Sequence, residues 1–107
     1  MKNFNLKDLE YNINKRGVSA TTLVDHKHAT IKNLFLNPGE KIPPHKVDVD
    51  VTFFILSGKG KITIGEETKA IKTYDIILCS PNTYMSLVAN EDSHLSFLNI
   101  KTPGLKS

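Results

Sequence analysis

The sequence predicts an all-β fold, a single antiparallel β-barrel or jelly roll with little or no helix. Roughly eight short segments rich in apolar or β-branched residues follow one another at even spacing, as in sandwiches and barrels. Residues that favour turns separate these segments, and no long stretch has the 3.6-residue apolar period of a helix. A chain of 107 residues has room for one modest core. We therefore expect one domain over residues 1–107, with its core at about 18–103 and an N-terminal arm at 1–17.

The first part of the chain predicts an arm followed by two strands. Residues 3–11 show only a weak, mixed period, compatible with a short helical turn or an irregular arm. Residues 18–24 are rich in threonine and β-branched side chains, which favour a strand. Residues 29–36 form the next predicted strand, and an Asn-Pro-Gly sequence ends it.

The central stretch predicts the main strand of the barrel and the mouth of its pocket. Pro43 and Pro44 have no amide hydrogen to donate, so we expect the chain to reach His45 in an irregular, extended approach. The two-residue period of the strand that follows places on one face Val47, Val49, Val51, Phe53 and Ile55. Residues 57–60 contain two glycines and predict a turn, and residues 61–64 predict a further strand.

The last part of the chain predicts four more strands separated by turns. These strands are expected at residues 69–72, 75–79, 84–89 and 94–101. Asn82 lies in the break between the second and third of them, and asparagine tolerates the left-handed backbone that otherwise requires glycine. Eight short strands and no long helix favour an antiparallel barrel.

Composition excludes several classes of function. The formal charge of +3 is spread along the chain and the aromatic residues lie mostly in apolar runs, so we expect no nucleic-acid partner. No segment approaches the roughly 20 apolar residues of a membrane span, and we expect no membrane partner. The N-terminal residues mix charged and apolar side chains, unlike a secretory signal. The single cysteine, Cys79, fits a reducing compartment, and we expect a cytoplasmic location.

With its strands, turns and histidine in this order, the chain resembles a small single-domain cupin, a member of a β-barrel family with two short sequence motifs. The first motif reads G-x5-H-x-H-x3-E-x6-G, and it aligns here at Gly39, His45 and Gly58. Val47 stands at the position of its second histidine, and Val51 stands at the position of its glutamate. The resemblance implies the cupin barrel and places His45 at the mouth of that barrel.

The second family motif, G-x5-P-x-G-x2-H-x3-N, is more degenerate in this chain. Its five fixed positions are occupied in order by Tyr74, Ser80, Asn82, Met85 and Ala89. The resemblance therefore covers about residues 29–101 as a pattern of strands and turns, while its functional positions are mostly replaced.

The resemblance implies a metal position that this chain no longer supplies with ligands. Metal-binding cupins hold iron, manganese, nickel or zinc with three residues of the first motif and a histidine of the second. The equivalent positions here are His45, Val47, Val51 and Met85. A first-row divalent metal needs roughly three or four strong donors, and one imidazole with one thioether does not provide them. We predict no cofactor at this position.

An alternative metal site would use a rearranged histidine set. His26 and His28 are two residues apart and share one face of a strand, a spacing that occurs in metal sites, and His45 would complete the set. The competing interpretation is that the first two are ordinary surface histidines. The cofactor in the alternative is a divalent ion of iron, manganese, nickel or zinc.

The predicted ligand pocket lies at the barrel mouth. We expect its lining to be His45, Val47, Val51, Phe53 and Met85, with Leu87 and Phe97 as deeper contacts. Apolar walls with one or two polar groups are typical of small-molecule sites, although the same side chains also fill the core of any small barrel. A neutral imidazole at this place can orient a ligand or act as a general base, or it can be purely structural.

Two functional interpretations remain open. The first is a cupin that binds a small, largely apolar molecule without the usual metal. It is expected to be a homodimer, because Phe54 and Leu56 give the main strand a second apolar face, which a partner subunit or the N-terminal segment would cover. The second is an enzyme, either a metal-dependent dioxygenase or isomerase that uses the rearranged histidines, or a metal-free isomerase or lyase with His45 as its base.

Overall fold

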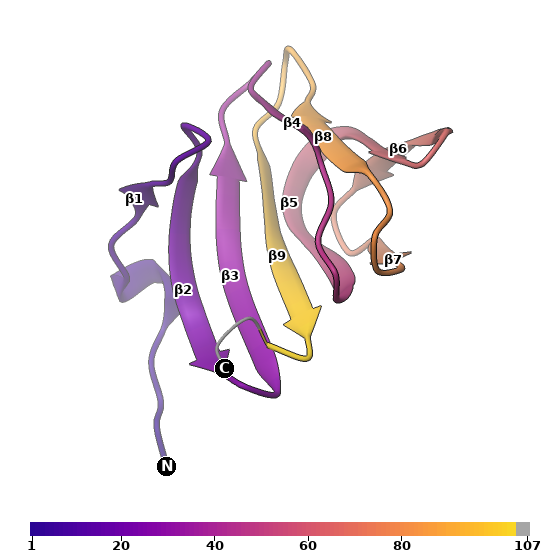
Figure 1. Ribbon diagram of the computed structural model, residues 1–107. Coiled ribbons are helices and arrows are strands. Elements are labelled where there is room, and N and C mark those ends of the chain that lie inside the picture. Colours follow the sequence, from indigo (N-terminus) through magenta and orange to yellow (C-terminus); the bar gives the residue numbers. More distant parts are fainter. Residues whose placement is uncertain (105–107) are drawn as a thin grey trace.

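The computed structural model describes residues 1–104, which fold into nine β-strands and one short 3-10 helix (Figure 1). The elements are η1 (Leu6–Asp8), β1 (Asn12–Ile13), β2 (Ser19–His26), β3 (Ala29–Leu36), β4 (Lys41–His45), β5 (Asp50–Ile64), β6 (Glu67–Lys72), β7 (Ile76–Cys79), β8 (Met85–Ala89) and β9 (Leu95–Thr102). The predicted all-β class is confirmed. No helix within these residues is long and apolar enough to cross a membrane.

All strand pairs are antiparallel, and the sheet curls into a jelly-roll barrel. The strand order is β1-β2-β3-β9-β5-β8-β4, and β6 and β7 also pair with β5. The long strand β5 pairs through its first half with β9 and β7 and through its second half with β8 and β6. Figure 1 shows β2, β3 and β9 side by side, with β8, β6 and β7 to their right. Because β5 belongs to both halves, its curvature closes the fold.

The turn predicted at residues 57–60 is wrong. The structure has one continuous strand of 15 residues through this region, with a shift of register between Ile55 and Ser57 opposite β9. Gly58 has a φ of 91°, and a Cβ atom there would lie 1.8 Å from the carbonyl oxygen of His94. Glycine is used in turns and also in bulges where another backbone approaches closely. Here it permits a bulge and a bend instead of a chain reversal.

The two prolines before His45 lie within β4. Lys41 and Ile42 pair with β8, as does His45, and the register shifts between Ile42 and His45. The prolines therefore occupy the irregular part of the strand, where their missing amide hydrogens leave no ladder bond broken. The next strand begins only at Asp50.

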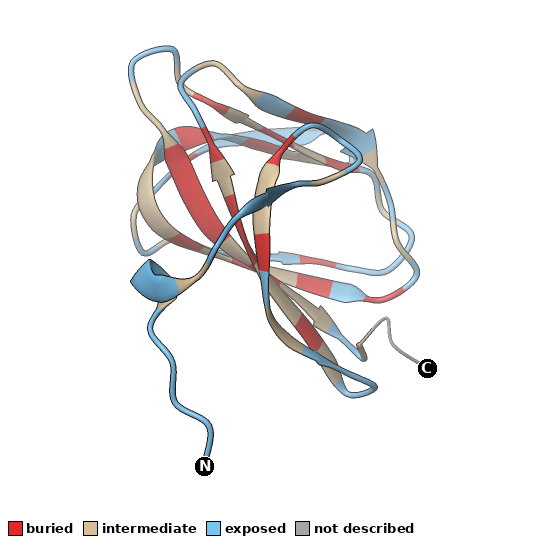
Figure 2. Cartoon of the chain, turned by 90° about the vertical axis from the view of Figure 1, so that its left-hand side faces the viewer, coloured by how far each residue is buried: buried red, intermediate tan, exposed pale blue. Residues whose placement is uncertain are grey.

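Alternate residues of the strands build the core. Val51, Phe53 and Ile55 are at most 1% exposed, as the two-residue period predicted, and the rings of Phe53 and Phe97 lie 5.8 Å apart between centroids. Burying each such side chain contributes roughly 1.5–3 kcal/mol. Figure 2 shows buried segments along the barrel strands, whereas the N-terminal segment is mostly exposed.

A buried asparagine on β3 anchors the segment before β2. The hydroxyl of Tyr11 donates a hydrogen bond to Oδ1 of Asn33, which is fully buried. Asn33 Nδ2 donates to Ser96 Oγ at 3.1 Å and to the carbonyl oxygen of Phe97 at 2.8 Å. Because the buried amide is satisfied at both ends, the network holds this segment against β3 and β9.

Candidate functional site

A small cavity of about 60 Å³ lies in the barrel, and several polar side chains converge on it. Its polar lining consists of Asn14, Arg16, Lys32, His45, Asn99 and Lys101. The apolar lining consists of Leu34, Ile42, Phe53 and Leu87. Its size suits a few ordered waters or the polar head of a small molecule. Six of the ten lining residues are polar or charged, so the cavity suits the polar or charged group of a ligand.

A larger hollow of about 360 Å³ lies beside β6 and β7, and its lining includes the core residues Ile62 and Ile71. Its charged lining includes Glu67 and Lys69, which form an ion pair of 3.6 Å with side chains 73% and 71% exposed. Exposed pairs of this kind contribute little binding energy, because water screens them. We therefore assign the candidate site to the smaller cavity, where the lining cations Lys32 and Lys101 are partly buried.

Strand register explains why Lys32, Asn99 and Lys101 face the same cavity. Lys32 on β3 lies directly opposite Asn99 on β9, and Asn99 lies directly opposite Phe53 on β5. Lys101 is two residues along β9 from Asn99 and therefore points to the same side of the sheet. Diagonal neighbours across an antiparallel pair lie roughly 7–8 Å apart, so the two lysines are close enough to repel each other.

The turn between β1 and β2 brings a third cation to the rim of the cavity. Asn14 Oδ1 accepts hydrogen bonds from the backbone amides of Arg16, at 2.9 Å, and of Val18, at 3.1 Å. Gly17 follows with a φ of 80°, and its amide donates to the carbonyl oxygen of Asn14 at 2.9 Å. Asparagine and glycine are the residues that such a turn requires. The turn places the exposed Arg16 at the edge of the cavity.

His45 ends β4 and is half-buried in the cavity wall. Its Nδ1 atom lies 3.1 Å from the carbonyl oxygen of Pro43, which can only accept. Nδ1 therefore carries the proton in the neutral ring, and Nε2 keeps a lone pair. Burial lowers the pKa of His45, and the charges of Arg16 and Lys101 lower it further against the effect of the Pro43 hydrogen bond. The imidazole is thus held neutral near pH 7.

Lys101 is a half-buried cation without a carboxylate partner in the cavity. Its Nζ atom donates a hydrogen bond of 2.8 Å to Oδ1 of Asn99, a neutral acceptor. Burial lowers the pKa of Lys101 to about 8, and the charges of Lys32 and Arg16 add to the effect. Within residues 1–104, no aspartate or glutamate lines this cavity. The electrostatic potential of the cavity is therefore positive, and no carboxylate among its described lining residues compensates it.

The structure brings together only some of the residues that the sequence placed in the pocket. His45 and Phe53 line the cavity, as does Leu87 from the deeper set. Val51 and Met85 are each 1% exposed and belong to the closed core, and Phe97 is fully buried there as well. Val47 is partly buried and packs against the same core.

Sequence reasoning missed the cationic part of the site, namely Arg16, Lys32 and Lys101. A signal for two of them was present. Lys32 has the same two-residue phase as Leu34 and Leu36, and Lys101 has the same phase as Phe97. A lysine in phase with core residues near the end of a barrel strand is a candidate pocket residue.

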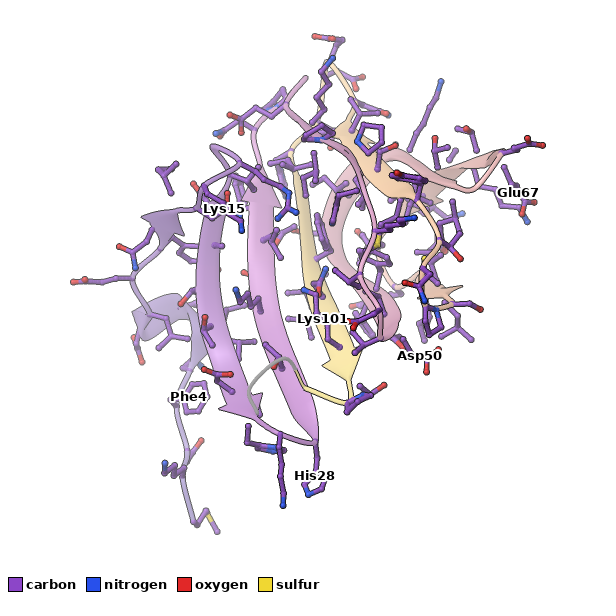
Figure 3. All side chains as sticks on the ribbon, in the orientation of Figure 1. Phe4, Lys15, His28, Asp50, Glu67 and Lys101 are labelled. Atoms are coloured by element: carbon purple, nitrogen blue, oxygen red, sulfur yellow. The ribbon has the colours of Figure 1, made fainter. Side chains whose placement is uncertain are left out.

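The positions of the histidines do not fit a bound metal ion. His26 and His28 are exposed at the turn between β2 and β3, and Figure 3 shows His28 pointing away from the sheet. Their ring centroids are 6.0 Å apart, and the His28 amide donates to Nδ1 of His26 at 3.1 Å. Among residues 1–104, no group of three or more histidine, cysteine, aspartate or glutamate side chains is arranged to hold a metal.

The family's metal position fits a divalent cation equally poorly. It offers the imidazole of His45 and the thioether of Met85, with valine at the other two ligand positions. The positive charges of Arg16 and Lys101 act on His45 from the same cavity. A dication there would lack donors and would be repelled by its surroundings.

Solved structures share this fold at low sequence identity. KdgF from a Halomonas species aligns with a TM-score of 0.86 and 13% identity, over 96% of this chain and 94% of the other. The polyketide cyclase RemF from Streptomyces resistomycificus aligns with a TM-score of 0.85 and 16% identity, over 95% and 79%. A conserved protein of unknown function from Streptococcus pyogenes is 26% identical, with a TM-score of 0.72 over 85% and 78%.

The sequence comparisons locate the family within the chain. No curated protein sequence matches it. The family model described as a cupin domain matches residues 34–101, well over half of the chain. Asn14, Arg16 and Lys32 lie outside the matched segment, whereas Lys101 is its last residue. The match and the shared fold together show that the chain belongs to the cupin domain family.

Proposed function

We propose that this cupin binds a small organic anion in the barrel cavity without a bound metal ion. The observation that supports the proposal is the group of Arg16, Lys32 and Lys101 around one cavity that no carboxylate of residues 1–104 lines. In this proposal the body of the ligand is small and largely apolar, as the sequence predicted, and its head group is anionic. A carboxylate is the head group that suits these side chains.

Electrostatics favours an anion for two reasons. Lys32 and Arg16 both disfavour the charged form of Lys101, so the cavity without a ligand contains unfavourable repulsion. A bound carboxylate relieves that repulsion and accepts charge-assisted hydrogen bonds. The guanidinium of Arg16 can bind two carboxylate oxygens at once, and the lysine ammonium groups provide further point charges.

The rest of the lining orients the ligand. Leu34, Phe53 and Leu87 offer apolar contacts to a hydrocarbon body. The Nε2 lone pair of the neutral His45 can accept a hydrogen bond from a hydroxyl or amide of the ligand. The fold does not select among these chemistries, because its structural neighbours include a polyketide cyclase and a protein of unknown function.

Matched pairs of ligands test the proposal. Thermal unfolding of the chelator-treated protein is measured with acetate, butyrate and benzoate, and with the corresponding uncharged amides. We expect the carboxylates to raise the unfolding temperature and the amides to have little effect. Equal stabilisation by acids and amides would show that the head group is not recognised by charge.

Two variants locate the effect in the cavity. Lys101→Met should abolish the stabilisation by carboxylates, and Lys69→Met should retain it, because Lys69 is exposed and does not line this cavity. Elemental analysis of the untreated protein tests the proposal that the cavity binds its ligand without a metal ion. Stoichiometric iron, manganese, nickel or zinc that is lost in His45→Ala would overturn it in favour of the metal-dependent alternative.

A further inference from the structure

Lys101 differs from a surface lysine in its surroundings. It lies near the end of β9, where Figure 3 labels it, and it lines the barrel cavity and is half-buried there. Its hydrogen-bond acceptor is the neutral amide oxygen of Asn99. By contrast, the exposed Lys69 is paired with the carboxylate of Glu67. A lysine that is partly desolvated and placed beside other cations is the usual arrangement of a nucleophilic lysine.

We propose that Lys101 forms an imine with a small oxo acid, whose carboxylate is held by Arg16 and Lys32. This inference rests on the proposed anion site and names the substrate class for it. In a 2-oxo acid the carbonyl carbon is bonded directly to the carboxylate carbon. A carboxylate held by the neighbouring cations therefore brings the electrophilic carbon to the lysine amine. The apolar lining takes the remaining hydrocarbon group.

The chemistry requires no other reactant. The lone pair of the neutral Nζ attacks the carbonyl carbon, and the carbonyl double bond opens to give a carbinolamine. The oxygen then leaves as water with the two amine hydrogens, and the nitrogen forms the C=N double bond. Uptake of one proton gives the iminium ion. His45 lines the same cavity with a free Nε2 lone pair and serves as the proton carrier.

The protonation state of Lys101 supports this role. A lysine with a pKa of about 8 has roughly 300 times more neutral amine at pH 7 than a lysine with the ordinary value of 10.5. The same neighbours that lower the pKa also hold the anionic end of the substrate. One group of cations therefore serves both binding and activation of the nucleophile.

Reductive trapping tests the proposal. The full-length protein is incubated with pyruvate and sodium cyanoborohydride, and intact mass and peptide mapping locate the secondary amine that forms. We expect one adduct per chain, on Lys101, with labelling at least about tenfold above that of Lys69. Labelling distributed evenly over the exposed lysines, or none on Lys101, would overturn the proposal.

Variants and a second carbonyl compound show whether labelling depends on the Lys101 amine and on the carboxylate of the substrate. Lys101→Arg keeps the charge and should lose the adduct, whereas Lys69→Arg should keep it. Lys32→Met retains Lys101 and should slow trapping by pyruvate much more than trapping by the uncharged acetone. Circular dichroism and thermal unfolding confirm that each variant is folded.

Lactate has the carboxylate of pyruvate but no carbonyl group, so it reports on anion binding alone. Stabilisation by lactate without trapping of pyruvate would refute the imine and leave the anion site intact. Trapping at Lys101 without stabilisation by lactate would support the imine and count against the anion site. Absence of both effects would overturn both proposals.

Discussion

At the scale of single residues, the main feature of this cupin is a set of like charges around one small barrel cavity. Lys101 is partly buried next to two other cations, and burial followed by these charges lowers its pKa to about 8. Such burial of a charge is unfavourable for folding and is tolerated where a ligand can offset it. The charges therefore indicate function more directly than the apolar lining does.

Removal of the Lys101 charge should stabilise the protein at neutral pH. The folded-state pKa lies below the ordinary 10.5, so the unfolded chain binds more protons between about pH 8 and 10.5 and stability rises with pH across that window. Lys101→Met should therefore gain on the order of 1 kcal/mol at pH 7, and the gain should shrink above pH 8. Urea unfolding at pH 7 and at higher pH measures it, with Lys69→Met as the control. A gain that does not depend on pH would contradict this explanation.

His45 should make the protein less stable in acid. Its folded-state pKa is lowered by burial and by Arg16 and Lys101, so the unfolded state binds more protons below the ordinary value of 6.5. Stability due to this residue is therefore complete above pH 6.5 and is lost as the pH falls through the lowered pKa. We expect the difference in unfolding temperature between the native protein and His45→Gln to change in favour of the variant between pH 7 and 5. A constant difference in unfolding temperature over this pH range would contradict the lowered pKa of His45.

At the scale of elements, β5 carries the architecture because it belongs to both halves of the barrel. The bulge near Ser57 gives the strand its bend, and Gly58 and Gly60 allow the neighbouring strands to approach closely. A Cβ atom at Gly60 would lie 2.3 Å from the carbonyl oxygen of Val88. Glycines that look like turn residues in the sequence are therefore packing residues in the fold.

Gly58→Ala should destabilise the protein strongly. The alanine Cβ would overlap the backbone carbonyl of His94, and the φ of 91° is unfavourable for any residue with a side chain. We expect a loss of about 3 kcal/mol or more in the free energy of unfolding. Gly17→Ala is the matched control, because Gly17 has a φ of 80° but no atom within 4 Å of the added Cβ. Its cost should be only about 1 kcal/mol, and equal losses in the two variants would show that the close approach is unimportant.

At the scale of the whole molecule, one outer face of the sheet is apolar. Register places Phe54 of β5 between Ile76 of β7 and Leu98 of β9, and it aligns Leu78 and Ile100 with the adjacent Thr52. Ile76 and Leu78 are 62% and 74% exposed. These aligned side chains carry no charge. In a dimer with a twofold axis through this face, the same side chains of the two subunits would therefore meet without repulsion between like charges.

We expect this face to form a homodimer. Light scattering coupled to size-exclusion chromatography should give twice the chain mass, and a stable contact should bury roughly 800 Å² per subunit. Leu78→Lys should shift the protein to the monomer, because it would place two lysines near each other across the axis. Lys41→Glu, an exposed position on β4, which pairs with β8 at the far end of the strand order, should leave the mass unchanged. A monomeric native protein at high concentration would contradict the expectation.

Much of the fold could be predicted from local patterns. The alternation of Val51, Phe53 and Ile55 identified the buried face of the main strand before any partner strand was known. Likewise, the spacing of Gly39, His45 and Gly58 indicated the family, which the match over residues 34–101 shows. These features depend on the two-residue strand period and on backbone geometry near each residue, and both are local properties.

The sequence by itself determined the all-β class, the buried faces and the absence of the family's usual metal ligands at their positions. Only the tertiary structure decided that residues 57–60 bend within a strand, since this depends on the pairing of β9 with residues 57–58 and of β6 and β8 with the residues that follow. Only the tertiary structure placed Arg16, Lys32 and Lys101 around one cavity. The physical reason is the same in both cases, because pairing between distant strands sets which side chains meet, whereas local propensity sets only which face each side chain occupies.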